Sequence, residues 1–232
     1  MRKKFLISIS RINVRHNLKK TANNAQIAYG YIRDAIFTGE IKPGSAVTEK
    51  WLGEHLQMSR TPVREAMIRL QYEGLITVIN NRAIVTTISP VDIQEIFQLR
   101  LLIEPQAAAI CVQRIEKEKM TEIRRFTEGL LKTKSQAYSS DIHDLHRVII
   151  EATKNKRWIT VSDYLRNQII RLLTASENIP GRIARSLEEH LLIIDAIIAG
   201  DPLMAESRMR GHIESNMNDM LDTTNFHFIF KE

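Results

Sequence analysis

Cysteine is almost absent from this sequence of 232 residues, in which Cys111 stands alone. A disulfide within the chain is therefore impossible, which suits a reducing cytoplasm. Long apolar runs are also missing. Even HLLIIDAIIAG is interrupted by Asp195 and is shorter than the roughly 20 apolar residues that a membrane helix needs. We therefore expect a cytoplasmic protein without a membrane span, with Cys111 in its core.

The N-terminal end lacks a convincing signal-peptide cleavage pattern. MRKKFLISIS has a charged start and a short apolar stretch, but Arg11 and Arg15 follow without a typical cleavage site. We interpret residues 1–23 as a basic flexible arm that can touch phosphates. Residues 223–232, which include NFHFIFKE, form an apolar tail.

Charge is unevenly distributed along the chain, whose net charge is +6. Up to Ser89 there are 14 Lys and Arg residues against 6 Asp and Glu residues, whereas from Pro90 onward the numbers are 19 and 21. The basic excess therefore lies entirely in the first part. This distribution is expected if the first part binds a polyanion such as DNA and the remainder does not.

The segment from Thr48 to Gly74 has the pattern of two short helices joined by a tight turn. Thr48 and Ser59 are good N-caps, and we expect the Ser59 hydroxyl to accept a backbone N–H of the second helix. Pro62 is tolerated in the first turn of that helix. The second helix carries apolar residues at helical spacing, at Val63, Met67 and Leu70. The pattern predicts a helix-turn-helix.

Residues 24–89 complete a winged version of this motif. A helical stripe begins at Asn24 and is ended by Gly39, while LITVINNRAIVTTI follows the second helix as two β-rich segments. Asn80 and Asn81 tolerate positive φ and therefore favour a hairpin turn between those segments. Three helices and a hairpin predict a winged helix-turn-helix DNA-binding domain.

Residues 90–222 have helical periodicity and no strand signal. VDIQEIFQLRLLIEPQAAAICVQRI predicts one long helix that Pro105 either kinks or breaks. Further helices are predicted over residues 120–134, 141–153, 157–175, 180–199 and 202–221. We therefore expect a mainly α protein in which a winged helix-turn-helix is followed by an all-α bundle.

These segments carry a family resemblance. IKPGSAVTEKWLGEHL, SRTPVREAMIRLQYEGLI and NNRAIV resemble the DNA-binding domain of GntR-family transcriptional regulators. LRLLIEPQAA, LHRVIIEATKNKRW and EEHLLIIDAIIAGDPLMAESRMRGHI resemble the FCD domain of the FadR-like branch. The resemblance implies a homodimeric repressor or activator that binds a short palindromic operator and responds to a small metabolite, with residues 90–222 as its effector-binding and dimerisation domain. Of the two, we expect a repressor.

The resemblance also implies which residues contact DNA. Carried over position by position, they are Lys50, Ser59, Arg60, Thr61, Arg64, Asn81 and Arg82. Arg60, Thr61 and Arg64 lie at the N-terminal end of the second helix, where a helix in the major groove meets bases and phosphates. The family often has arginine in place of Lys50, and usually has glycine where this chain has Ala83. The wing turn is therefore expected to differ.

Three histidines, His146, His190 and His212, fall on three different predicted helices that can face one bundle interior. Imidazole suits zinc, nickel and similar ions, and the resemblance implies one divalent ion per protomer at these positions. The family's usual aspartate is replaced by Ile142. Asp141 or His143 is the candidate for the fourth ligand. The alternatives are a site of three histidines alone, or one that binds an effector without metal.

Arg100 and Arg171 are candidates for binding an organic acid in the same interior. Arg100 can instead form a salt bridge with Glu104, one helical turn further on. The resemblance suggests that a small carboxylate metabolite is the effector.

Two other functions use the same histidines. A metal-dependent enzyme would need an open metal position and a general base, and the sequence contains no HExxH motif. We therefore do not expect an enzyme. A dedicated metal sensor, in which the metal itself is the signal, is the second alternative.

Overall fold

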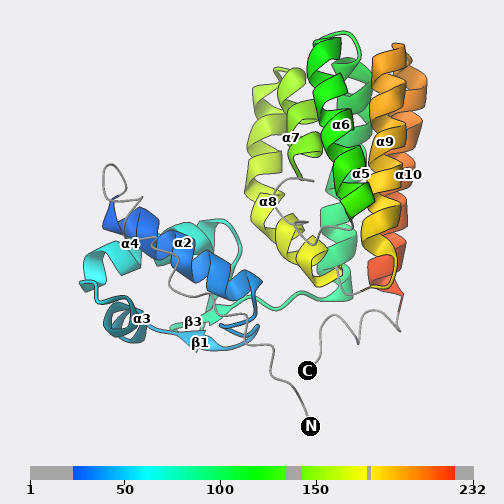
Figure 1. The fold of residues 1–232 in the computed structure, drawn as a ribbon. Helices are drawn as coiled ribbons and strands as arrows, with labels where there is room; N and C mark the ends of the chain where they lie inside the picture. The colour runs from blue at the N-terminus through cyan, green and yellow to red at the C-terminus, as the bar shows by residue number, and fades with distance from the viewer. Residues whose placement is uncertain (1–22, 134–142, 177–178, 223–232) are drawn as a thin grey trace. The chain divides into compact units, whose positions relative to one another are not determined.

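The computed structural model describes residues 23–133, 143–176 and 179–222 (Figure 1). The chain forms two compact units, Met1–Thr86 and Thr87–Glu232. In the described residues the first unit holds three helices and a small sheet, and the second holds six helices. The predicted fold class is therefore confirmed.

The three helices of the first unit are α2 (Asn24–Phe37), α3 (Glu49–Leu56) and α4 (Arg60–Tyr72). Thr48 caps α3 as predicted, because its hydroxyl accepts the Trp51 N–H at 3.1 Å. Ser59 occupies the N-cap of α4, but its hydroxyl makes no capping hydrogen bond, so that part of the prediction is wrong. The hydroxyl is exposed at the end of the helix and remains available to another partner.

The wing is an antiparallel sheet of β1 (Ala46–Val47), β2 (Ile76–Ile79) and β3 (Arg82–Val85), in the order β1-β3-β2. Asn80 and Asn81 turn the β2–β3 hairpin with φ of 49° and 59°. Ala83 lies inside β3 opposite Val78, so no glycine is required there. The short strand β1 was not predicted, because two residues after a Pro-Gly turn are too few to show alternation.

The turn between α3 and α4 depends on close backbone packing. Gln57 takes a left-handed conformation with φ of 54°, and the Met58 N–H donates to the Gly53 carbonyl at 2.9 Å. A Cβ at Gly53 would lie only 3.0 Å from the Met58 carbonyl oxygen. This contact sets how closely α3 approaches the start of α4.

Gly53→Val should therefore destabilise the first unit by about 1–3 kcal/mol, the usual cost of inserting atoms into a packed site. Gly30→Val is the control, since a Cβ at Gly30 has no neighbour within 4 Å. Its stability should change by no more than about 0.5 kcal/mol. Thermal or urea unfolding of both full-length variants tests the difference. Equal stabilities would contradict the packing argument.

The helices of the second unit run as predicted. They are α5 (Pro90–Cys111), α6 (Lys117–Thr133), α7 (His143–Ala152), α8 (Lys156–Ser176), α9 (Arg182–Ala199) and α10 (Pro202–Leu221). Ser89 and Asp92 form a capping box that begins α5. The helix continues through Pro105, so this proline does not break α5 into two helices.

The helical bundle in Figure 1 packs α5 against α10 and α7, and α9 against α6 and α10. Its core is built from apolar side chains of all six helices, among them Phe97, Met120, Ile149, Leu172, Ile193 and Ile213. Cys111 is buried in this core, as expected. In the described residues no helix is long and apolar enough to cross a membrane.

A candidate metal centre and a DNA-binding surface

Three imidazoles meet inside the second unit. His146 comes from α7, His190 from α9 and His212 from α10. The Nε2 atom of His190 lies 3.1 Å from Nε2 of His146 and 3.2 Å from Nε2 of His212. His190 and His212 are each only 2% exposed. The three histidines selected from the sequence are thus brought to one buried point.

Two carboxylates orient two of these rings. Glu104 Oε2 lies 2.6 Å from His146 Nδ1, and Glu189 Oε2 lies 2.7 Å from His212 Nδ1. An ionised carboxylate can only accept a hydrogen bond, so each Nδ1 carries the proton and donates it. The Nε2 atoms of His146 and His212 are then unprotonated when the rings are neutral, and they turn their lone pairs toward His190.

Arginines hold both carboxylates in place. Arg100 Nε donates to Glu104 at 2.7 Å, so the salt bridge considered from the sequence is present. Arg182 is fully buried and donates to Glu189 at 2.6 Å and to Asp219 at 2.7 Å. Two series of hydrogen-bonded side chains therefore lead to the centre, Arg100–Glu104–His146 and Arg182–Glu189–His212. Each series compensates for charges that burial would otherwise make costly.

The surroundings fix the charge states of two of these groups. Burial alone would raise the pKa of Glu104, but the charges of Arg100 and His146 and their hydrogen bonds outweigh it, so the pKa stays well below its usual range. Burial, together with the charges of His146, Arg100 and Arg182, lowers the pKa of His212 well below its usual value. At neutral pH Glu104 is therefore ionised and His212 is neutral.

Hydrogen bonds among the imidazoles cannot account for the whole arrangement. His190 Nε2 can carry one proton and donate it to one neighbour, which leaves its other close Nε2 contact without a proton. A cation that accepts all three lone pairs removes this conflict. Nitrogen atoms bound about 2.0–2.1 Å from a tetrahedral zinc ion lie about 3.3 Å apart, close to the separations here. The donor set therefore suits zinc or a similar divalent ion.

Asn216 also lies beside this centre, and sequence reasoning did not select it. Its Nδ2 is 3.2 Å from His212 Nε2, and the residue is 1% exposed. Its spacing of one helical turn from His212 is a signal that could have identified it, because residues four apart share a helix face. Glu189 offered no such signal, since its role depends on the rotation of α9 against α10.

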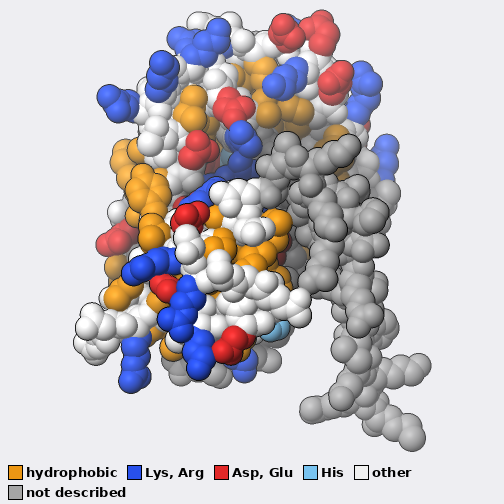
Figure 2. All heavy atoms as spheres, turned by 90° about the vertical axis from the view of Figure 1, so that its left-hand side faces the viewer, with side chains coloured by type: hydrophobic (Ala, Val, Ile, Leu, Met, Phe, Trp, Pro, Cys, Tyr) orange, Lys and Arg blue, Asp and Glu red, His pale blue; other side chains and the backbone are white. Residues whose placement is uncertain are grey.

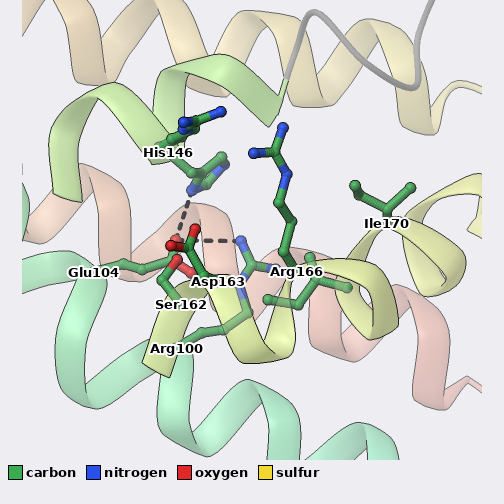
Figure 3. A pocket seen from close by; sticks show the side chains of 9 residues that line it. Arg100, Glu104, His146, Ser162, Asp163, Arg166 and Ile170 are labelled. Atoms are coloured by element: carbon green, nitrogen blue, oxygen red, sulfur yellow. Dashed lines mark hydrogen bonds and ion pairs between the residues drawn. The ribbon is translucent and has the colours of Figure 1, made fainter. Parts of the chain in front are cut away.

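A pocket borders the centre on the side of His146 (Figure 3). Its empty space, with open solvent at the mouth included, is about 430 Å³. Arg100 and Glu104 enter it from α5, and Ser162, Asp163 and Arg166 enter it from α8. Arg166 directs its guanidinium to the side of the pocket where His146 lies. With Arg147 of α7, three arginines line the pocket against the carboxylates of Glu104 and Asp163, an excess of one positive charge that suits an anionic ligand.

The structure does not describe the side chains of the other residues discussed for this centre. Asp141 and Ile142 lie outside the described residues. His143 begins α7 and Arg171 lies in α8, but the side chains of both are outside the described part of the structure. Arg166 of α8 lines the pocket, whereas sequence reasoning selected Arg171 and did not consider Arg166.

All seven residues selected for DNA contact are exposed: Lys50, Ser59, Arg60, Thr61, Arg64, Asn81 and Arg82. Arg64 makes an ion pair with Glu49 at 3.3 Å, yet its side chain remains 71% exposed. On the face in Figure 2, basic and acidic side chains are intermixed. On this face charge alone therefore does not outline a DNA-binding surface, and the seven contacts stay a prediction from the helix and wing positions.

A winged helix-turn-helix joined to a helical bundle with a buried polar centre defines the class of two-domain transcriptional regulators. Comparison with known proteins gives the family. Residues 24–85 match "Bacterial regulatory proteins, gntR family", and residues 95–215 match the FCD domain. The chain belongs to the GntR family, in the FadR-like branch that carries an FCD domain. It is therefore a DNA-binding transcriptional regulator and not an enzyme.

Several known proteins are similar to this chain. An uncharacterized HTH-type transcriptional regulator of Agrobacterium vitis is 36% identical over 115 residues, which cover 48% of this chain and 67% of that protein. The gluconate operon transcriptional repressor of Bacillus subtilis is 26% identical over 219 residues, 88% and 86% of the two chains. The structure of Escherichia coli McbR/YncC has a TM-score of 0.70 at 21% identity, over 88% and 99% of the chains, and so shares the fold.

Glu104→Gln removes the charge that pairs with buried Arg100, and we expect it to cost about 3–5 kcal/mol of stability at neutral pH. Because the pKa of Glu104 is lowered in the folded protein, this contribution is complete above the unfolded value of about 4.3 and is lost as the pH falls further. Urea unfolding of chelator-treated protein across this pH range measures both effects.

Glu151→Gln is the matched control for this test. Glu151 pairs with Arg147 in the same i, i+4 manner, but on the surface, where ion pairs contribute about 0–1 kcal/mol. Equal losses in the two variants, or a loss at Glu104 that does not shrink in acid, would contradict the assigned charges.

Proposed function

We propose that this chain is a ligand-responsive repressor that binds a palindromic operator as a homodimer. A small organic acid and a divalent metal ion in the FCD domain modulate its affinity for DNA. The observation that carries the proposal is the inward-facing set of three histidine Nε2 atoms beside an arginine-lined pocket, on a chain whose other unit is a DNA-binding domain.

The first step is operator binding by the N-terminal end of α4. Arg60 and Arg64 project there from exposed positions, and the free Ser59 hydroxyl can donate to a phosphate. The helix end adds a partial positive charge. Asn81 and Arg82 at the tip of the wing extend the contact to the neighbouring backbone. Two copies related by a two-fold axis would place two such helices on adjacent half-sites.

Repression is supported by the names of relatives. Besides the gluconate operon repressor, a probable D-xylose utilization operon transcriptional repressor of Paenarthrobacter nicotinovorans is 27% identical over 184 residues, 77% of this chain. Both are described as operon repressors.

Three histidines would hold the metal ion, with Glu104 and Glu189 as the supporting carboxylates. When bound, the ion supplies a positive charge for a carboxylate of the effector. Arg100 Nη1 is buried and has no hydrogen-bond partner in the described structure, so it can donate to the same ligand. Arg166, half-buried at the pocket, provides a second cationic group. An anionic ligand would satisfy both.

Effector binding changes DNA affinity only if the acid has different affinities for two arrangements of the dimer, one that binds DNA well and one that binds it poorly. The pocket joins residues of α5, α7 and α8, so a bound acid fixes these helices relative to one another. Because α5 is also the first helix after the DNA-binding unit in sequence, a change in its position is the simplest way to reach the recognition helices.

Arg64→Ala should weaken operator binding by about 1–3 kcal/mol and lower the salt dependence by about one counterion if it contacts a phosphate. DNA fragments that the wild type selects from a random pool provide the operator for fluorescence anisotropy. Arg208→Ala removes an exposed arginine from α10 and is the control. An unchanged affinity for Arg64→Ala would contradict the assigned surface.

Chelator treatment should abolish the response of operator affinity to organic acids, because the acid then lacks its main positive partner. A panel of small mono- and dicarboxylates is titrated into protein bound to the selected operator, before and after treatment. We expect an active acid to shift affinity roughly 5- to 150-fold, and only with metal. A shift caused by metal alone would instead identify a metal sensor, and an acid response in metal-free protein would contradict the proposal.

A further inference from the structure

Asn216 directs its amide at the proposed metal centre from a position where water is excluded. It lies one helical turn after His212 on α10 and is 1% exposed. Its Nδ2 is 3.2 Å from His212 Nε2, the same nitrogen that lies 3.2 Å from His190 Nε2. The amide is therefore next to the three histidine nitrogens and not merely on their helix.

The other end of this amide is unsatisfied. Asn216 Oδ1 is buried and has no hydrogen-bond partner in the described structure. A buried carbonyl oxygen without a partner is unfavourable and calls for a specific explanation, such as an ion. Oxygen and nitrogen exchange places when the amide rotates by half a turn, and their assignment follows from the hydrogen-bonding network.

Metal binding would reverse the preferred orientation of this amide. In the present orientation the Asn216 N–H donates to the His212 Nε2 lone pair. A metal ion bound to His212 takes the same lone pair, so the N–H loses its acceptor. After a half-turn, the carbonyl oxygen faces the ion instead. Amide carbonyl oxygens are established ligands of divalent cations.

We propose that Asn216 is a fourth protein ligand of the divalent ion, through its carbonyl oxygen Oδ1. It takes the role of the aspartate that the family resemblance places at Ile142. The proposal rests on the metal centre of the proposed function and assigns a residue that the resemblance does not supply. All four protein donors are then neutral, whereas an aspartate would offset one positive charge.

This neutral set has a consequence for the effector. The ion keeps its full double charge, so it binds an anionic ligand more strongly than a centre with one carboxylate does. The neutral ligand set also lowers the affinity of the centre for the metal ion, because a carboxylate attracts the ion more than an amide does. The centre is accordingly specific for acids and releases its metal more readily than an aspartate-containing one.

Asn216→Asp and Asn216→Leu test the assignment together. Aspartate keeps the oxygen and removes the N–H, whereas leucine removes both at similar size. Cobalt(II) is titrated into chelator-treated full-length protein against a chromophoric chelator, and its visible absorption is recorded. Asn216→Leu should bind cobalt at least about tenfold more weakly, with a changed spectrum. Asn216→Asp should bind it at least as tightly as the wild type.

Asn218→Asp and Asn218→Leu are the matched controls, since Asn218 is exposed two residues further along α10. Both should leave cobalt affinity and spectrum unchanged. If Asn216→Leu fails to fold by circular dichroism, the comparison of Asn216→Asp with Asn218→Asp decides the matter. An increased affinity and altered spectrum only in Asn216→Asp support oxygen ligation.

Three results would overturn the assignment. The first is an Asn216→Asp variant that binds cobalt as weakly as Asn216→Leu, because equal losses mean that the N–H is what matters. Unchanged binding in both variants means that the amide plays no part. A wild-type protein that binds no cobalt removes the metal centre as well, while operator binding measured in parallel shows whether the DNA-binding function stands.

Discussion

The pairing of two buried arginines with buried Glu104 and partly buried Glu189 is the interaction on which the helical unit depends. Arg100 with Glu104 and Arg182 with Glu189 place four charged groups in an interior that otherwise consists of apolar helix faces. Alone, these groups would cost several kcal/mol each, and well-packed apolar residues would stabilise the bundle as well or better. Their value therefore lies in orientation. Each carboxylate holds a histidine Nδ1 and so turns Nε2 toward the centre.

The oriented histidines bring several helices of the second unit to one centre. The histidines come from helices far apart in sequence, and α5 contributes Glu104 and Arg100 to the same centre. A ligand that completes the centre thus adds to the apolar packing and the polar bonds that already join these helices. The first unit contains no comparable buried charge network in its described residues. Its polar groups are exposed at the start of α4 and on the wing, where a polyanion can reach them.

Helical spacing predicted much of this arrangement. The periodicity of the apolar residues predicted each helix of the bundle and allowed His146, His190 and His212 to face one interior, while the family resemblance selected them as metal ligands. Local chemistry predicted the Thr48 cap and the Asn80-Asn81 turn. These features depend on residues close together in the chain, which is why sequence patterns contain them.

Features that depend on the rotation of one helix against another were not predictable. Glu189 and Asn216 reach the centre only because α9 and α10 present particular faces to each other, and Arg166 reaches the pocket because of how α8 packs on α7. Ser59 shows that a feature within one helix can also escape prediction from the sequence. Its position at the start of α4 followed from its residue type, but the rotation of its hydroxyl away from the helix did not.

Native mass spectrometry of the purified full-length protein, beside a His190→Ala variant, tests the central claim most directly. His190 lies between the other two imidazoles, so its removal takes away the middle of the donor set. The account predicts a dimer that carries one divalent ion per chain in the wild type and none in the variant. A metal-free wild type, or equal metal content in the variant, would contradict it.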